Sequence, residues 1–185
     1  MRIRLLFTLL ILLTQHKVFA QDTAFVTNMH QAHEILNQLI ARSFPEFKPE
    51  QVTLTPYKDE GYFFQTNFVF RTVFKHPLHI KIKIDTSIFK LNCPVAAFEA
   101  VLAHELCHGV DYQRLKGVKI IKILPYAISK KFRKNIEHQT DIAAINKGYK
   151  EGLIAYKLWL YPLLNEEQLK WKKYYYLTPE EINNK

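Results

Sequence analysis

The residues of this chain best suited to chemistry are two histidines and a glutamate in the run His104-Glu105-Leu106-Cys107-His108. The small and apolar residues around them predict a helix, on which His108 lies ~40° and Glu105 ~100° round from His104. Two neutral imidazoles can bind one Zn²⁺ while the neighbouring carboxylate polarises a water on the metal. The pattern has only three fixed positions, so two histidines held by ordinary hydrogen bonds on a half-buried helix are the alternative.

A catalytic zinc site needs a third protein ligand and an open position for water. A histidine six residues after His108, with glycine midway between them, is excluded because the chain has Asp111 and Arg114 there. Asp111 itself is disfavoured as the ligand, because on a continuing helix it is rotated ~60° beyond the far side of His104.

A second predicted helix offers a better third ligand. Glu137 and Asp141 are four residues apart and therefore share one face of that helix. Glu137 would complete the zinc site, and Asp141 would accept a hydrogen bond from the outward ring nitrogen of His104 or His108. An acidic pair on a solvated helix face is the alternative reading.

The combination of His104-Glu105-x-x-His108 and Glu137-x-x-x-Asp141 resembles the gluzincin zinc metallopeptidases, and the compact size is similar to the small single-domain minigluzincins. The resemblance covers roughly residues 79–150. It implies one Zn²⁺ per chain, with His104, His108 and Glu137 as ligands, Glu105 as general base and Asp141 as the group that orients a ligating histidine. It also implies that the strand near residue 79 borders the cleft and pairs with an extended substrate.

The reaction implied is hydrolysis of a peptide bond in a peptide or protein substrate by a zinc-activated water. A further donor for the oxyanion is expected, and the sequence does not choose among His138, Tyr112 and Tyr149. Two other functions stay open. One is a non-catalytic basic protein that binds the cell envelope, and the other is a zinc amidase acting on peptidoglycan.

Residues 1–20 have the pattern of a secretory signal peptide: Arg2 and Arg4, an apolar run, and small residues before a cleavage point at Ala20. The rest, 21–185, is predicted to form a single zincin-like metallopeptidase domain, exported to the periplasm or secreted. Removal of the leader deletes three basic residues and no acid, and lowers the formal charge from +9 to +6.

The segment 114–134 contains eight basic residues and no acid. It predicts an exposed excursion between the two helices of the site, acting as a lid or meeting an anionic envelope or membrane surface, with a plain solvated face as the alternative. For an exported protein such partners are more plausible than nucleic acid. The sequence says nothing of the oligomeric state.

The hydrophobic periodicity predicts an α+β fold with a small antiparallel or mixed sheet. We expect a helix over 22–43, strands over 52–55, 62–64, 67–74 and 79–85, and the histidine helix capped by Asn92 or Cys93. The alternation in 79–85 indicates a strand at or near a sheet edge. The aromatic tail predicts helices closing over the back of the site, and the spacing of Cys93 and Cys107 predicts no disulfide.

Overall fold

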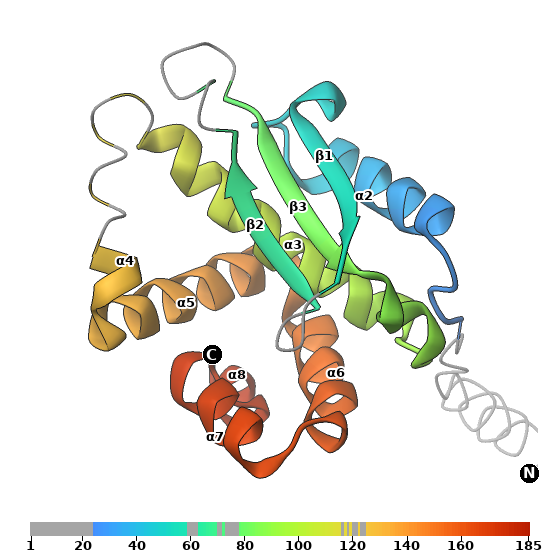
Figure 1. Cartoon of the computed structure of the whole chain (residues 1–185), viewed down its shortest axis with the longest axis vertical. Coiled ribbons are helices and arrows are strands. Elements are labelled where there is room, and N and C mark those ends of the chain that lie inside the picture. The colour runs from blue at the N-terminus through green and yellow to red at the C-terminus, as the bar shows by residue number, and fades with distance from the viewer. Residues whose placement is uncertain are drawn as a thin grey trace, which may run out of the picture.

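The computed structural model describes residues 24–58, 63–69, 72, 78–115, 117, 119, 122 and 125–185. The predicted signal peptide and much of the basic excursion lie outside these residues. The fold is α+β, with one small sheet and helices packed around a central helix (Figure 1). In the described part of the chain, no helix is both long and apolar enough to cross a membrane.

The sheet has three strands, β1 (Val52–Tyr57), β2 (Phe64–Phe68) and β3 (Ile80–Asp85), in the order β1-β3-β2. β1 pairs with β3 in parallel and β2 pairs with β3 antiparallel, so the sheet is mixed. The predicted strands 62–64 and 67–74 are, within the described residues, the single strand β2. Its register places Phe64 opposite Ile84 and Phe68 opposite Ile80.

The isoleucines of β3 are all buried, while Lys81 and Lys83 on its other face are half-buried, as the alternation predicts. The predicted place of this strand at a sheet edge is wrong, because β3 is central and both its sides are paired. The alternation reports which face meets the core and carries no information about how many neighbours a strand has.

Helix α2 (Met29–Ser43) begins later than predicted. The side chain of Asn28 accepts a hydrogen bond from the Gln31 N–H and caps the helix, while Phe25 forms an extended bridge with Pro94. An Asn at this position stabilises a helix start by satisfying an amide without an intrahelical partner. The described residues before Asn28 therefore lie against the start of the central helix.

The central helix α3 (Val95–Arg114) carries the histidine motif, and every residue from Ala100 to Val110 is buried. Its predicted cap is wrong, because Pro94 occupies that position and no side chain caps the helix. The helix continues through Gly109 for a further turn. Four elements, β2, α2, α5 and α6, pack against α3. This packing explains why the stretch from Ala100 to Val110 has no face exposed to solvent.

The remaining helices follow α3 in the order in which Figure 1 colours them from yellow to red. Helix α5 is capped by Ser129, and Gly148, with φ 94°, kinks the chain within the π turn that leads into α6. Three short 3₁₀ turns complete the described structure. The bounds are α4 Pro125–Ile128, α5 Lys130–Ala144, π turn Ile145–Tyr149, α6 Lys150–Leu160, α7 Glu166–Tyr175, α8 Pro179–Asn183, and 3₁₀ turns Pro49–Gln51, Thr86–Lys90 and Tyr161–Leu163.

Helix α6 lies very close to α3 at Gly152. A Cβ atom there would lie 2.6 Å from the Ala96 carbonyl oxygen and 2.6 Å from the Ala100 Cβ atom. Only a glycine facing an alanine permits this approach, and the alanine-rich start of α3 is explained by it. Cys93 and Cys107 are both free, in agreement with the prediction that they form no disulfide, and both are buried. Burial raises the pKa of the Cys107 thiol to about 12, consistent with an inert core residue.

Candidate metal centre

Helix α3 carries His104, Glu105 and His108 into the interior of the domain. The two histidines expose 4% and 8% of their surface, and Glu105 exposes 8%. The imidazole rings of His104 and His108 are 4.9 Å apart between centroids and nearly perpendicular, at 83°. The i and i+4 spacing places both rings on the same side of α3, as the helical geometry predicts.

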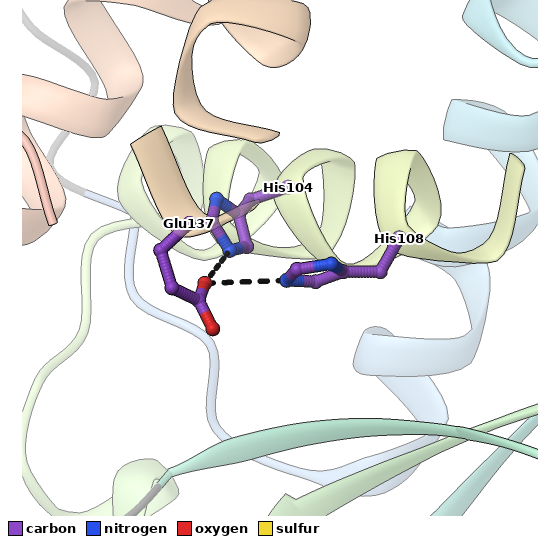
Figure 2. Close-up of side chains that lie close together, drawn as sticks. All are labelled: His104, His108 and Glu137. Atoms are coloured by element: carbon purple, nitrogen blue, oxygen red, sulfur yellow. Dashed lines mark hydrogen bonds and ion pairs between the residues drawn. The ribbon is translucent and has the colours of Figure 1, made fainter. Parts of the chain in front are cut away.

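Helix α5 brings Glu137 against these rings, as Figure 2 shows. The Oε2 atom of Glu137 lies 3.3 Å from the Nε2 atom of His104 and 3.3 Å from the Nε2 atom of His108. These three ligand atoms all lie within 4.8 Å of one another, and all three side chains are buried. The group can therefore hold a metal ion.

Asp141, one turn further along α5, holds the outer side of His104. Its Oδ1 atom lies 2.9 Å from the Nδ1 atom of His104. Its Oδ2 atom accepts from the Lys157 ammonium at 3.2 Å and from the Leu177 N–H at 3.0 Å. A carboxylate with these donors accepts from Nδ1–H, which leaves the Nε2 atom of His104 facing Glu137 as the ring nitrogen that can bind a metal once its proton is displaced.

Thr140 performs the same task for His108. Its hydroxyl donates to the Ile136 carbonyl oxygen at 2.9 Å, and its oxygen lies 3.3 Å from the Nδ1 atom of His108. Because the only hydroxyl proton is already donated, the Thr140 oxygen accepts from Nδ1–H. Both histidines thus direct their Nε2 atoms to the same point, at the Oε2 atom of Glu137. Thr140 was not identified from the sequence, although its i+3 spacing from Glu137 is a usable signal.

Tyr126 of α4 donates a hydrogen bond to the Oε1 atom of Glu137. Burial, together with the charge of Glu137, raises the pKa of this phenol, so it remains a donor. The bond fixes the glutamate so that only Oε2 faces the imidazoles. Sequence reasoning did not select Tyr126, because nothing in the spacing of the basic excursion distinguishes it.

The charges of the site are strongly coupled. Burial works against protonation of His104, but the hydrogen bonds that its ring donates to Asp141 and Glu137 outweigh burial and raise the histidine pKa to about 10. Burial likewise works against ionisation of both carboxyls, yet the pKa of Glu137 is held well below its usual value by His108 and His104. Lys157 and His104 lower the pKa of Asp141. Both carboxylates are therefore anionic, and a metal ion competes with a proton at His104.

The three candidates for an oxyanion donor lie in different places. The Tyr112 ring stacks on His108 at 6.3 Å between centroids and 18° between planes, so it borders the site. Tyr149 lies elsewhere: its hydroxyl bonds with Ser43 at 2.6 Å and with Arg42 at 3.2 Å on α2.

His138 is half-buried on α5, and its Nε2 atom is buried without a hydrogen-bond partner in the described part of the chain. Burial, with the charge of Lys134, lowers the His138 pKa. Asp111 is the other acid considered as a third ligand. Its Oδ1 atom lies 3.4 Å from a guanidinium nitrogen of Arg114, and it is not part of the group formed by His104, His108 and Glu137. Of these residues, Tyr112 is the one that stacks on a candidate ligand, His108.

The C-terminal tail, which includes α7 and α8, contacts His104 and the carboxylate that holds it. The Tyr176 ring lies 5.9 Å from the His104 ring, and the next residue donates its N–H to Asp141. The tail was expected to close over the back of the site, and these contacts agree with that expectation. A capping box formed by Thr178 and Glu181 begins α8.

Comparisons of the chain with protein-family models, with curated proteins and with solved structures give no match.

Proposed function

We propose that this protein is an exported zinc-dependent peptidase of the gluzincin type, which hydrolyses peptide bonds with Glu105 as general base. One observation carries the proposal. Two imidazole nitrogens and the carboxylate oxygen of Glu137 converge within 4.8 Å of one another. A second buried glutamate, Glu105, is the residue next to His104.

The two separations that join Glu137 to the imidazole nitrogens suit zinc. Ligands that are each 2.0–2.1 Å from a tetrahedral ion lie about 3.3–3.4 Å apart along the edges of the tetrahedron. The two N···O separations to Glu137 are both 3.3 Å. Three protein ligands of N₂O type leave one tetrahedral position for water, which is the arrangement of catalytic rather than structural zinc.

When bound, zinc supplies a water of lowered pKa and polarises the substrate carbonyl. Glu105 would act as the general base that accepts a proton from the attacking water and returns it to the leaving nitrogen, so the residue would be restored within one turnover. Asp141 and Thr140 hold the tautomers of His104 and His108 that keep both Nε2 lone pairs available. Tyr126 holds Glu137, the third ligand, by donating a hydrogen bond to its Oε1 atom.

The sheet offers one edge beside this site. β3 is paired on both sides and cannot receive a substrate strand, so β-augmentation by the segment near residue 79 is not available. β2 is the edge strand nearest α3, because the Thr66 hydroxyl donates to the Glu105 carbonyl oxygen at 3.3 Å. An extended peptide paired with the outer edge of β2 would run past Glu105.

The first test measures metal and cleavage together. We expect one zinc per chain by elemental analysis, and cleavage of denatured casein or a peptide library that a chelator abolishes. Glu105→Gln should keep its zinc and lose cleavage, since the substitution removes only the base. Glu137→Ala should lose zinc, while Asp111→Ala, which removes an acid outside the group, should keep it. Full zinc in Glu137→Ala would contradict the ligand assignment.

The same preparation separates the two other functions. Release of soluble fragments from peptidoglycan without cleavage of any peptide in the library would favour the amidase. Absence of chelator-sensitive cleavage on either substrate would favour a binding protein whose metal group is structural.

A further inference from the structure

Tyr126, whose phenol donates a hydrogen bond to Glu137, belongs to α4, a helix of only 4 residues. A single helical turn is not stable by itself in water, because its first hydrogen bond fixes several residues at once. The position of the phenol therefore depends on what α4 packs against. In the described part of the chain, the main neighbour of α4 is α5 (Figure 1).

Arg133 of α5 makes two contacts with Tyr126. Its Nε–H donates to the Tyr126 carbonyl oxygen at 3.3 Å. Its guanidinium carbon lies over the Tyr126 ring, 5.0 Å from the centroid. A planar guanidinium can stack on a ring and donate a directed hydrogen bond at the same time, whereas an ammonium group cannot stack in this way. Arg133 therefore holds both the backbone and the ring of Tyr126.

Helix α7 supports Arg133 through a second aromatic ring. The guanidinium carbon lies 5.5 Å from the ring centroid of Tyr175, a residue that exposes only 4% of its surface. The Tyr175 ring in turn lies 4.6 Å from the Trp171 ring. A continuous series of contacts thus runs from α7 through Arg133 and Tyr126 to Glu137.

The last contact of this series divides the two oxygens of Glu137. Oε1 accepts from the Tyr126 phenol, while Oε2 lies 3.3 Å from the Nε2 atoms of His104 and His108. A carboxylate can bind a metal ion through one oxygen or through both. Binding through one oxygen leaves a tetrahedral position open beside the two imidazoles, whereas the second oxygen would add a ligand.

We propose that Arg133 is a positioning residue of the candidate metal centre, which holds Tyr126 on one oxygen of Glu137 so that the other oxygen alone is offered to the metal ion. The proposal rests on the zinc site of the proposed function. Arg133 itself contacts neither the ion nor a substrate, and it acts through Tyr126.

The first test replaces zinc by Co²⁺ in chelator-treated protein, because the visible absorption of Co²⁺ is several-fold stronger in four-coordinate than in five-coordinate sites. Tyr126→Phe removes only the hydroxyl, and Arg133→Met removes the guanidinium. Both should convert a strong four-coordinate spectrum into a weak five-coordinate one. Lys131→Met, which removes an exposed cation two residues away, should keep the original spectrum.

The second test measures zinc affinity by competition with a chelating dye. Tyr126→Phe and Arg133→Met should each weaken binding by about 10-fold to 100-fold, as expected when a group that orients a ligand is removed. The double variant should bind as the weaker single variant does, because both substitutions remove one shared contact. Arg133→Lys keeps the charge but not the planar group, so it should resemble Arg133→Met, and it carries the test if the methionine variant does not fold.

An unchanged Co²⁺ spectrum in the Arg133 variants, or additive losses of zinc affinity in the double variant, overturns the proposal. Peptide cleavage by the unmodified protein is measured separately. A protein that binds zinc in the predicted Arg133-dependent way and cleaves no peptide would support this proposal and contradict the peptidase. Cleavage together with unchanged spectra and affinities in all variants would support the peptidase and overturn the role of Arg133.

Discussion

The Oδ2 atom of Asp141 lies 3.2 Å from the Nζ atom of Lys157, and both side chains are buried. Through its other oxygen, the same carboxylate holds His104. The ion pair therefore connects α6 to the candidate metal centre, and we expect both stability and metal binding to depend on this one side chain.

Asp141→Asn should destabilise the protein by about 3–5 kcal/mol, because it leaves Lys157 buried without its carboxylate. It should also weaken metal binding by about 10-fold to 100-fold, since His104 loses the partner that fixes its tautomer. Urea unfolding and a zinc competition assay measure the two effects. Asp111→Asn is the control, because its carboxylate is about half exposed and its pairing with Arg114 should contribute no more than about 1 kcal/mol.

A double variant separates the two roles. In Asp141→Asn with Lys157→Met, the stability should recover in part, because no unpaired charge remains buried, while zinc affinity stays low. Strictly additive losses of stability would contradict the ion pair.

Thr140→Val should lower zinc affinity by about 10-fold, because the valine has the shape of threonine but cannot accept the Nδ1–H of His108. Thr140→Ser keeps the hydroxyl and should bind zinc as the unmodified protein does. Equal zinc affinity in the serine and valine variants, measured by competition with a chelating dye, would show that His108 needs no such partner.

The pH dependence follows from the raised pKa of His104, about 10 in the metal-free fold. An unfolded histidine has a pKa of about 6.5, so protonation favours the metal-free fold. That stabilisation is complete below about pH 6.5 and is lost as the pH rises towards about 10. Urea unfolding of chelator-treated protein at several pH values should show this decline.

Zinc affinity should change in the opposite direction, because the metal must displace the His104 proton. We expect the apparent affinity to increase from pH 6 to pH 9, with proton release detected by calorimetry in buffers of different ionisation enthalpy. An affinity independent of pH would contradict a protonated His104 in the metal-free protein.

Gly152→Ala should destabilise the protein by about 1–3 kcal/mol, although alanine is the better helix former by about 1 kcal/mol. The added Cβ would lie 2.6 Å from both the Ala96 carbonyl oxygen and the Ala100 Cβ atom, so α6 must move away from α3. Glu151→Ala, an exposed neighbour on the same helix, controls for helix propensity. A higher melting temperature in Gly152→Ala would contradict the close packing of the two helices.

Local patterns in the sequence predicted the elements that carry the site. The helical spacing of His104 and His108, and that of Glu137 and Asp141, follow from periods that a single helix fixes by itself. The predicted position of β3 at a sheet edge was wrong, and so was the predicted cap of α3. Both features depend on segments far away in the chain. Tyr126 could not be found either, since its contact with Glu137 depends on how α4 is placed against α5.

The sequence alone determined which side chains share a face of each helix, because a helix of 3.6 residues per turn sets that without any other element. Only the tertiary structure decided that α3 and α5 meet, that Asp141 holds His104 while Thr140 holds His108, and that the tail places Lys172 in the wall of the same cavity as Glu105. The physical reason is that these contacts depend on the packing of whole elements in a shared core, which short sequence periods do not encode.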